Sequence, residues 1–463
     1  MKIYAIVLAA GKGTRMKSQR PKVVHDVLYK PMINHVVDEL KLMGVDETIV
    51  VVGHEAQQVE AILDNVEFVY QKEQLGTGHA VLQAKDILKD KEGITLVLNG
   101  DAPLIRKETL QGLVEFHMNN HNQATVMSAD CDVSNHYGRI IKEDGQVIGI
   151  VEYKDLQEYQ MDVTEMNTGE YCFDNQKLFE ALDEVTNENA QNEYYLTDVI
   201  GIMNNKQLKV DAYKIDDFNE VGGINDRIAL AQATQILRDR INQEHLLNGV
   251  TIIDPHNTYI GRDVVIGEDT IIEPGCILKG KTVIGKDCHI GPYCELTNVT
   301  IKDNVEIKFS VISDSIIENG VDIGPYARLR TNCHILENVH MGNFVEMKKA
   351  IFGKNSKAAH LTYIGDAEVG SDVNIGCGTI TVNYDGKNKS LTKIKDNAFI
   401  GCNSNLIAPV TIEKNAFIAA GSTITKDVEK DAMGIARAKQ VNKEGYSKVL
   451  KEKRLKEFEK RNK

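Results

Sequence analysis

The C-terminal half of the sequence follows a six-residue period, and this feature constrains the fold more than any other. Aliphatic residues stand at Ile260, Ile266 and Ile272, and the same spacing returns at Ile412 and Ile418. Glycine follows several of these positions. Hexapeptide repeats are the signature of a parallel β-helix, in which one inward aliphatic side chain per repeat builds a continuous core. We therefore predict a β-helix over most of residues 250–463.

The period slips at two places, residues 332–346 and residues 383–392. A slip predicts a loop that leaves the coil. Loops on a rigid scaffold commonly carry function, so both segments are candidates for a site.

Residues 1–228 follow a different pattern, in which apolar runs alternate with helical stretches. The runs at 3–10, 47–52, 67–70, 94–99 and 124–129 predict strands, and those at 35–43, 56–64 and 109–119 predict helices. This alternation indicates an α/β, Rossmann-like domain with a mostly parallel sheet and helices on both faces. Such sheets bind ligands beyond the carboxyl ends of their strands.

A helix is predicted between the two patterns. Apolar residues recur at helical spacing from Ile228 to Ile241, and neither Gly nor Pro interrupts them. We expect three parts: an N-terminal domain at 1–228, a helical linker at 229–249 and a repeat domain at 250–463. From Val441 onward the chain is rich in Lys and Glu, which predicts a short solvated helix or a frayed end.

Composition excludes several classes of protein. The formal net charge is 54 − 67 = −13, which argues against general affinity for nucleic acid or anionic membranes. No apolar run reaches the roughly 18 residues of a membrane span, and the start of the chain lacks a signal-peptide cleavage pattern. The eight cysteines are scattered. These features predict free thiols and a cytoplasmic location.

A glycine-rich turn follows the first predicted strand, in the segment LAAGKGTRM at residues 8–16. Its backbone amides can converge on phosphate oxygens, and Arg15 and Lys22 can add positive charge. The segment is neither a Walker A loop nor GxGxxG, because Met16 stands at the position of the third glycine. The alternative interpretation is an ordinary strand-to-helix turn.

Two further polar segments follow predicted strands. Gln74–Gly78 reads QLGTG, and residues 99–104 read NGDAPL, which puts Asp101 at a strand end. Nucleotidyl transfer needs a hard cation across the phosphates, and Mg²⁺ is usually held by one or two oxygen ligands. Asp101 is the natural candidate. A capping role is the alternative.

Taken together, these segments resemble the nucleotide-sugar pyrophosphorylase family, with YGRI at 137–140, NTG at 167–169 and VGGIN at 221–225 in the order that family shows. Combined with the repeats, the chain is similar nearly end to end to the bacterial bifunctional N-acetylglucosamine-1-phosphate uridylyltransferase and glucosamine-1-phosphate N-acetyltransferase family. This resemblance implies synthesis of UDP-N-acetylglucosamine, a precursor of the cell envelope. The phosphate of N-acetylglucosamine-1-phosphate attacks the α-phosphorus of UTP, and pyrophosphate leaves. The resemblance implies Arg15 and Lys22 as catalytic cations and Asp101 and Asn225 as Mg²⁺ ligands, with Asn225 also contacting substrate. It further implies nucleotide contacts at Leu8, Gly11, Lys22, Gln71, Gly76 and Thr77, and sugar contacts at Gly138, Glu152 and Asn167.

Acetyl transfer to an amine needs a base, and a histidine suits that task near neutral pH. His289, His334, His340 and His360 are candidates, which the residues alone do not rank. The resemblance implies His360 as the base, with Glu346 as a partner that orients it.

The resemblance also implies the remaining contacts of the acetyl site. The acyl donor is acetyl-CoA, and the cysteines among its contacts are not expected to act as nucleophiles. A left-handed β-helix is implied, with a homotrimer whose acetyl sites are shared between neighbouring subunits. The implied contacts are Arg330, Lys348, Tyr363 and Asn374 for glucosamine-1-phosphate, Asn383 and Tyr384 on a loop over the donor, and Cys377, Cys402, Ala420 and Arg437 for acetyl-CoA.

Two other functions are compatible with parts of the pattern. A monofunctional pyrophosphorylase could use the β-helix only to organise subunits, although His360, Lys348 and the loop at Asn383-Tyr384 argue against that. A regulatory module that senses UDP-sugars would need no catalytic cations.

Overall fold

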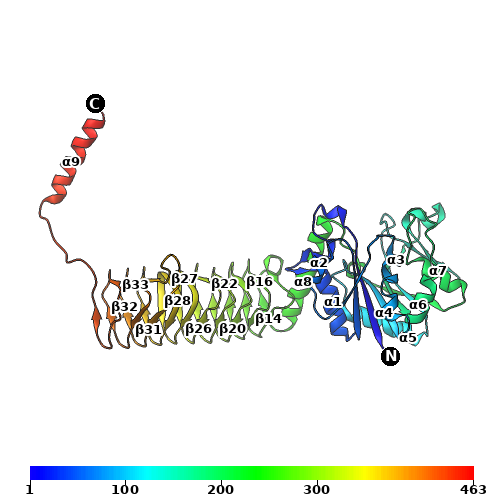
Figure 1. Cartoon of the computed structure of the whole chain (residues 1–463), viewed down its shortest axis with the longest axis horizontal. Helices are drawn as coiled ribbons and strands as arrows, with labels where there is room; N and C mark the ends of the chain where they lie inside the picture. Colours follow the sequence, from blue (N-terminus) through cyan, green and yellow to red (C-terminus); the bar gives the residue numbers. More distant parts are fainter. Residues whose placement is uncertain (463) are drawn as a thin grey trace. The chain divides into compact units, whose positions relative to one another are not determined.

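The computed structural model describes residues 1–462 (Figure 1). It divides into two compact units. The first comprises Met1–Gln243 with Ile260–Arg262, and the second comprises Glu244–Tyr259 and the residues from Asp263 onward. The long helix α8 (Arg227–Leu247) crosses this division. No helix in residues 1–462 combines the length and the apolar character that a membrane crossing needs.

The first unit is built on a mixed sheet, which counts nine strands within residues 1–462 and has the central order β11-β7-β10-β6-β1-β4-β5. Most neighbouring strands on this path run parallel, whereas β10 runs antiparallel to β6 and β7. The strands are β1 (Ile3–Ala9), β4 (Glu47–Val52), β5 (Glu67–Tyr70), β6 (Ile94–Asn99), β7 (Ala124–Asp130), β8 (Arg139–Glu143), β9 (Gln146–Val151), β10 (Glu165–Asp174) and β11 (Val210–Ile215). The separate pair β2 (Asp26–Val27) and β3 (Lys30–Pro31) forms a two-stranded sheet.

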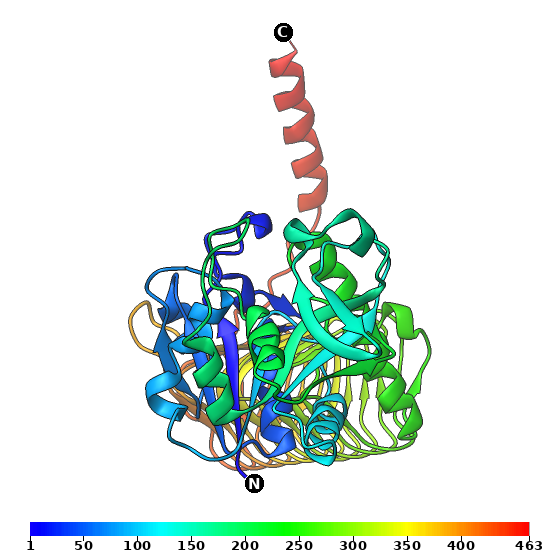
Figure 2. The ribbon, with the colours of Figure 1, turned by 90° about the vertical axis from the view of Figure 1, so that its right-hand side faces the viewer.

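Helices cover both faces of this sheet (Figure 2). Alternation along β1 decides which side chains meet them, since Tyr4 and Ile6 enter one core and Ala5 and Val7 enter the other. The first core is closed by α3 (Thr77–Leu82), α4 (Lys85–Leu88), α6 (Asn175–Leu182) and α7 (Asp198–Asn205). The second is closed by α1 (Met32–Met43), α2 (Ala56–Glu60) and α5 (Lys107–Asn119). The predicted doubly covered, mostly parallel sheet is confirmed.

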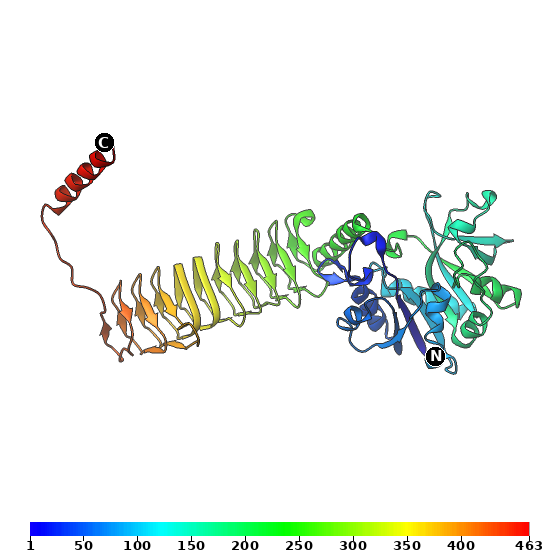
Figure 3. The same ribbon diagram turned by 45° about the horizontal axis from the view of Figure 1, so that its top comes forward.

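The second unit is the predicted left-handed parallel β-helix, whose short strands stack coil upon coil (Figure 3). Each strand pairs in parallel with the strand one coil further on, so that Ile272 lies beside Ile290 and Ile290 beside Ile307. These inward residues are fully buried. One aliphatic side chain per side of each coil therefore forms the continuous core.

The first coils contain β12 (Thr251–Ile252), β13 (Tyr259–Ile260), β14 (Val265–Ile266), β15 (Ile271–Ile272), β16 (Ile277–Lys279), β17 (Val283–Ile284), β18 (His289–Ile290), β19 (Glu295–Thr297), β20 (Thr300–Ile301), β21 (Glu306–Ile307), β22 (Val311–Ser313), β23 (Ile316–Ile317), β24 (Asp322–Ile323), β25 (Arg328–Leu329) and β26 (His334–Ile335). The later coils contain β27 (His340–Phe352), β28 (Lys357–Val369), β29 (Asn374–Ile375), β30 (Ile380–Val382), β31 (Thr392–Ile394), β32 (Phe399–Ile400), β33 (Asn405–Ile407), β34 (Val410–Ile412), β35 (Phe417–Ile418), β36 (Thr423–Ile424) and β37 (Met433–Gly434). The exposed helix α9 (Tyr446–Arg461) follows them.

The two predicted excursions from the coil have different outcomes. Residues between β30 and β31 do leave it, and Tyr384 forms an isolated bridge with Lys389 there. The excursion predicted at 332–346 was wrong: His334 pairs with Ile316, and β27 continues in register with β28. The inward series keeps its six-residue spacing through Ile335, Met341 and Met347, and the next inward residue, Phe352, follows after only five.

Candidate functional site

A cavity of about 300 Å³ opens at the carboxyl ends of β1 and β6 in the first unit. Six of the residues implied for the nucleotide line it, together with the candidate metal ligand Asp101. Its lining consists of Leu8, Ala9, Ala10, Gly11, Lys22, Val23, Gln71, Gln74, Gly76, Thr77, Ala80, Asn99, Asp101 and Glu193. The position agrees with the rule that open α/β sheets bind ligands beyond the carboxyl ends of their strands.

The two glycine-containing turns contribute to the walls of this cavity, and both need glycine for close packing. Gly13 has φ +58°, and a Cβ there would lie 2.6 Å from the Cβ of Lys22. Gly76 has φ +115°, and a Cβ there would lie 2.5 Å from the carbonyl oxygen of Tyr194. The absence of a side chain thus lets Lys22 and the 194–196 segment approach the walls.

Four polar side chains meet at one end of the cavity. The Lys22 amine forms an ion pair with the Asp101 carboxylate and lies 3.0 Å from the Asn225 Oδ1. The Arg15 guanidinium donates to the same Asn225 Oδ1 at 2.8 Å. Asn225 is contributed by the segment just before α8. One cationic nitrogen therefore touches both oxygens, which shows that the Asp101–Asn225 pair can share a single cation.

The residues implied for the sugar form a second group. In β8 Arg139 pairs with Val151 of β9 and Met166 of β10, so that Gly138, Glu152 and Asn167 occupy the adjacent row. The backbone N–H of Asn167 donates to the backbone carbonyl of Gly138 at 2.9 Å.

Hydrogen bonds with neighbouring residues hold the side chains of Glu152 and Asn167 in place. Thr197 Oγ1 donates to Glu152 at 3.2 Å, and burial raises the pKa of the Glu152 carboxyl above its ordinary value. Asn167 Nδ2 donates to the Tyr171 hydroxyl at 2.8 Å. The row is thus pre-organised by the fold.

Asn99, Gln74 and Glu193 also line the cavity. Asn99 and Gln74 belong to the two polar segments seen in the sequence, which assigned them no contact, whereas Glu193 was missed. The position of Asn99 at the end of β6, two residues before Asp101, was a usable signal. Glu193 carried no comparable signal, because only the packing of its loop against Gly76 brings it to the wall.

A buried carboxyl stands behind Asn99. Asn99 Nδ2 lies 3.2 Å from Glu170 Oε1 and 3.2 Å from the Gly169 carbonyl oxygen. Glu170 is fully buried, and this burial raises its pKa to about 8. The carboxyl is therefore mainly protonated at neutral pH.

In the second unit, His360 lies on the exposed surface of β28. Its Nδ1 is 2.9 Å from the Oδ1 of Asn343, the residue beside it one coil earlier. The partner expected from the sequence, Glu346, was wrong, because Glu346 pairs with Arg330 at 3.2 Å. Register explains the difference, since Glu346 lies beside Tyr363 rather than His360.

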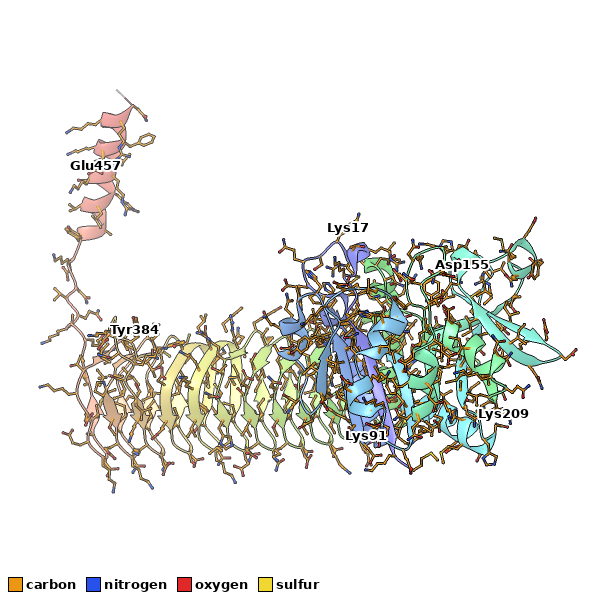
Figure 4. The ribbon with its side chains drawn as sticks, turned by 45° about the vertical axis from the view of Figure 1, so that its right-hand side comes forward. Lys17, Lys91, Asp155, Lys209, Tyr384 and Glu457 are labelled. Carbon is orange, nitrogen blue, oxygen red and sulfur yellow. The ribbon has the colours of Figure 1, made fainter. Side chains whose placement is uncertain are left out.

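Basic side chains gather on the same coils. Lys348 lies beside Gly365, and the Lys389 amine next to it lowers the pKa of Lys348 below its ordinary value. Lys389 belongs to the projecting loop, which also carries Tyr384 (Figure 4). Sequence reasoning missed Lys389, because its approach to Lys348 depends on the path of the loop.

Asn383 anchors this loop, since its side-chain amide donates to Asp366. Asn374 of β29 lies beside Lys357, which is three residues before His360.

The residues implied for the acyl donor form a column over successive coils. The carbonyl oxygens of Cys377, Cys402 and Ala420 each accept a hydrogen bond from the following coil, at 2.7, 2.8 and 2.8 Å. The donor to Ala420 is Arg437 Nη1. The structure thus brings these four residues together.

Comparison with known proteins follows the same division. A family model described as "Nucleotidyl transferase" matches residues 4–236. Models described as "GMPPB C-terminal domain" and "Bacterial transferase hexapeptide (six repeats)" match residues 259–333 and 391–426.

Whole-chain relatives decide the family. The protein named "Bifunctional protein GlmU" from Geobacillus sp. (strain WCH70) is 55% identical over 448 residues, which cover 96% of this chain and 98% of the relative. The protein of the same name from Listeria monocytogenes serotype 4a (strain HCC23) is 53% identical over 451 residues, covering 97% and 99%. The chain belongs to the GlmU family. Because the match to these GlmU proteins spans both units, the sheet domain and the β-helix form one family architecture.

Proposed function

We propose that the cavity of the first unit is the uridylyl-transfer site of this GlmU-family chain and that the coils around His360 carry its acetyl-transfer site. The chain is a bifunctional enzyme that makes UDP-N-acetylglucosamine from glucosamine-1-phosphate by acetylation and then uridylyl transfer. We assign the second reaction to residues 1–228 and the first to residues 250–463. The meeting of Lys22 with both Asp101 and Asn225 beside the cavity at the strand ends carries the first assignment.

We propose Asp101 and Asn225 as the ligands of a Mg²⁺ ion. Carboxylate and amide oxygens are donors that Mg²⁺ accepts, and one or two protein ligands suffice when substrate phosphates and waters complete the shell. Within residues 1–462, no group of three or more His, Cys, Asp or Glu side chains could hold a metal by itself. This sparse donor set fits a metal that binds together with a nucleotide. When bound, Mg²⁺ would neutralise charge on the phosphates.

The protein's own groups then account for uridylyl transfer by positioning. The walls at Gly11 and Gly76 hold UTP, and the row of Gly138, Glu152 and Asn167 orients the sugar. The sugar phosphate oxygen forms a bond to the α-phosphorus, while the bond between the α-phosphorus and the bridging oxygen breaks and pyrophosphate leaves. Arg15 and Lys22 stabilise negative charge on the phosphates, so no covalent enzyme intermediate is needed.

Acetyl transfer uses a base that is oriented by its neighbour. Since Asn343 Oδ1 accepts from Nδ1, the proton of the neutral imidazole lies on Nδ1 and Nε2 is free to accept one. The amine of glucosamine-1-phosphate forms the C–N bond with the acetyl carbon, the C–S bond breaks and CoA leaves as the thiolate, which then receives the proton that the amine gives up. His360 takes the proton of the amine.

We assign the remaining cations and amides of these coils to substrate binding. Arg330 and Lys348 suit the sugar phosphate. Tyr363 lies beside Glu346 one coil earlier, and Asn374 lies beside Lys357 one coil earlier. Acetyl-CoA is assigned to the column formed by the carbonyls of Cys377, Cys402 and Ala420, with Asn383, Tyr384 and Arg437 beside it.

We also propose a homotrimer in which a neighbouring copy covers the acetyl site. His360, Arg330 and Tyr384 are exposed on one chain, whereas acyl transfer benefits from exclusion of water. An aromatic ladder ends beside Asn343 and supports association. In it Tyr293, Phe309, Tyr326 and Phe344 follow one another with ring centroids 5.9, 5.5 and 5.5 Å apart, and three of these rings are more than half exposed.

A cytoplasmic location is the further part of this proposal. All eight cysteines are free, and a reducing compartment keeps thiols in that state.

The decisive assay supplies the full-length protein with glucosamine-1-phosphate, acetyl-CoA, UTP and Mg²⁺, and follows free thiol and pyrophosphate separately. Both signals are expected, with pyrophosphate dependent on Mg²⁺ and on prior acetylation. Pyrophosphate from supplied N-acetylglucosamine-1-phosphate without a thiol signal would leave a uridylyltransferase with a structural β-helix. Binding of UDP-sugar without either signal would favour a regulatory module.

A further inference from the structure

A fully buried arginine lies directly beneath the proposed sugar row. Arg139 is the first residue of β8, and its side chain is among the largest that have no solvent exposure. Its Nη2 donates to the carbonyl oxygens of Val133 at 2.9 Å and Asn135 at 3.1 Å, and its Nη1 donates to that of Tyr137. A single guanidinium thus binds three carbonyls of the loop between β7 and β8.

Burying the Arg139 guanidinium costs more free energy than burying an apolar side chain that only fills space. Within the described chain no carboxylate forms an ion pair with Arg139, and its Nε has no hydrogen-bond partner. The charge is compensated by the three carbonyls and by the ring of Tyr153, whose centroid lies 5.9 Å from the guanidinium carbon. Burial of a cation costs several kcal/mol, and an apolar side chain of similar volume would avoid that cost. The observed geometry therefore points to a role in placing the loop.

The loop leads directly into both parts of the site. Tyr137 contacts Phe218 edge-on, with centroids 5.2 Å apart, and burial raises the pKa of its hydroxyl, which has the Gly223 backbone as a neighbour. Gly223 in turn lies against the carboxylate of Asp101. The next residue, Gly138, begins the sugar row.

The strand register places Arg139 directly next to the sugar row. Arg139 lies between Val151 and Met166, and the residues that follow these two, Glu152 and Asn167, flank Gly138. A shift of the Arg139 backbone or of its loop would displace Gly138 against both neighbours. The cavity walls at Gly11 and Gly76 belong to other segments of the chain.

We infer that Arg139 is a positioning residue for the sugar-phosphate half of the uridylyltransferase site, acting by clamping the 133–137 carbonyls so that Gly138 is held in line with Glu152 and Asn167. This inference rests on the proposed function. A lysine retains the charge but lacks the planar fork that reaches three acceptors, so it should restore the site only in part.

The test compares full-length Arg139→Lys and Arg139→Met with wild type in steady-state pyrophosphate release, with each substrate varied in turn. The Met variant is expected to raise the KM for N-acetylglucosamine-1-phosphate roughly 10-fold to 100-fold, as for a small misplacement of a binding group, with a clearly smaller change in the KM for UTP. The Lys variant should fall between wild type and the Met variant. Acetyl transfer on the same chain should stay at the wild-type rate.

Lys142→Met is the matched control, because it removes a cation from the same strand, where Lys142 pairs with Glu165 at 2.6 Å. It should leave both KM values unchanged. Equal increases in both KM values, or wild-type values in the Arg139 variants, would overturn the inference. If the Met variant does not fold, the KM split in the Lys variant decides. Absence of pyrophosphate release by wild type would instead reject the proposed function.

Discussion

The two proposed sites of this chain are constructed in opposite ways. The first unit encloses its residues in a cavity, and side chains far apart in sequence meet there: Lys22 and Asn225 are 203 residues apart. The β-helix displays its residues on an exposed surface, and its key contact joins Asn343 to His360, neighbours on successive coils. The sheet domain therefore forms its site from residues that are distant in sequence, whereas the β-helix forms its site from residues on successive coils and leaves them exposed.

This difference predicts that the two activities fail independently. Asp101→Asn should reduce uridylyl transfer about 10³-fold or more, because it weakens charge neutralisation that is worth several kcal/mol. Acetyl transfer should be unchanged. The measurement is pyrophosphate release alongside thiol release on the same preparation.

Asp130→Asn is its control, because Asp130 also ends a strand of the sheet but pairs with Lys214 at the surface at 2.7 Å. Loss of both activities in Asp101→Asn would indicate misfolding and would break the comparison.

His360→Ala tests the converse case, in which the exposed acetyl-transfer site fails and the uridylyl-transfer site is kept. Loss of the base should lower acetyl transfer about 10²-fold or more while uridylyl transfer continues. Thiol release from acetyl-CoA measures the effect.

His334→Ala and His340→Ala serve as controls, since these histidines lie one coil before His360 and pair with Glu318 and Asp322. Our assignment of the base is wrong if His360→Ala retains wild-type acetyl transfer.

Glu170→Gln should change how the stability of the first unit depends on pH, because Glu170 is buried there. Because its carboxyl has a pKa of about 8 in the folded protein, against an ordinary 4.5, folding takes up a proton between these values. The contribution of Glu170 to the stability of the first unit is therefore lost as pH rises from about 4.5 to 8. Glutamine cannot ionise, so the variant should lose this dependence and be more stable at pH 8, by an amount on the order of a few kcal/mol.

Urea unfolding at pH 5 and pH 8 measures this change. The exposed Glu180→Gln, which removes a surface pair with Lys177, is the control and should leave the pH dependence intact. An unchanged slope in Glu170→Gln would mean that Glu170 is ionised in the folded protein.

Cys402→Ala should have the smallest effect. Cys402 is exposed, and its carbonyl accepts a hydrogen bond that alanine keeps. Acetyl transfer should stay within about twofold of wild type, as for an ordinary surface substitution. Thiol release measures it, and a loss as large as that in His360→Ala would point to covalent catalysis by the thiol.

Much of the architecture could be predicted from the sequence, because the relevant patterns are local. The hexapeptide period places one aliphatic residue on each side of a coil, and this rule is read from neighbouring residues alone. The same holds for the alternating strands and helices of the first unit. The prediction failed at 332–346, where the strands stay in the coil and the one-residue shortening comes just after, between Met347 and Phe352.

By itself, the sequence determined the β-helix, the covered sheet and the residue types at the ends of β1 and β6. Only the tertiary structure decided that Asn343 rather than Glu346 meets His360, that Asn99 and Glu193 face the cavity, and that Lys389 approaches Lys348. It also decided that Arg139 and Glu170 are buried. The physical reason is that periodicity records which face of an element is apolar, whereas register and loop path set which polar groups meet across elements.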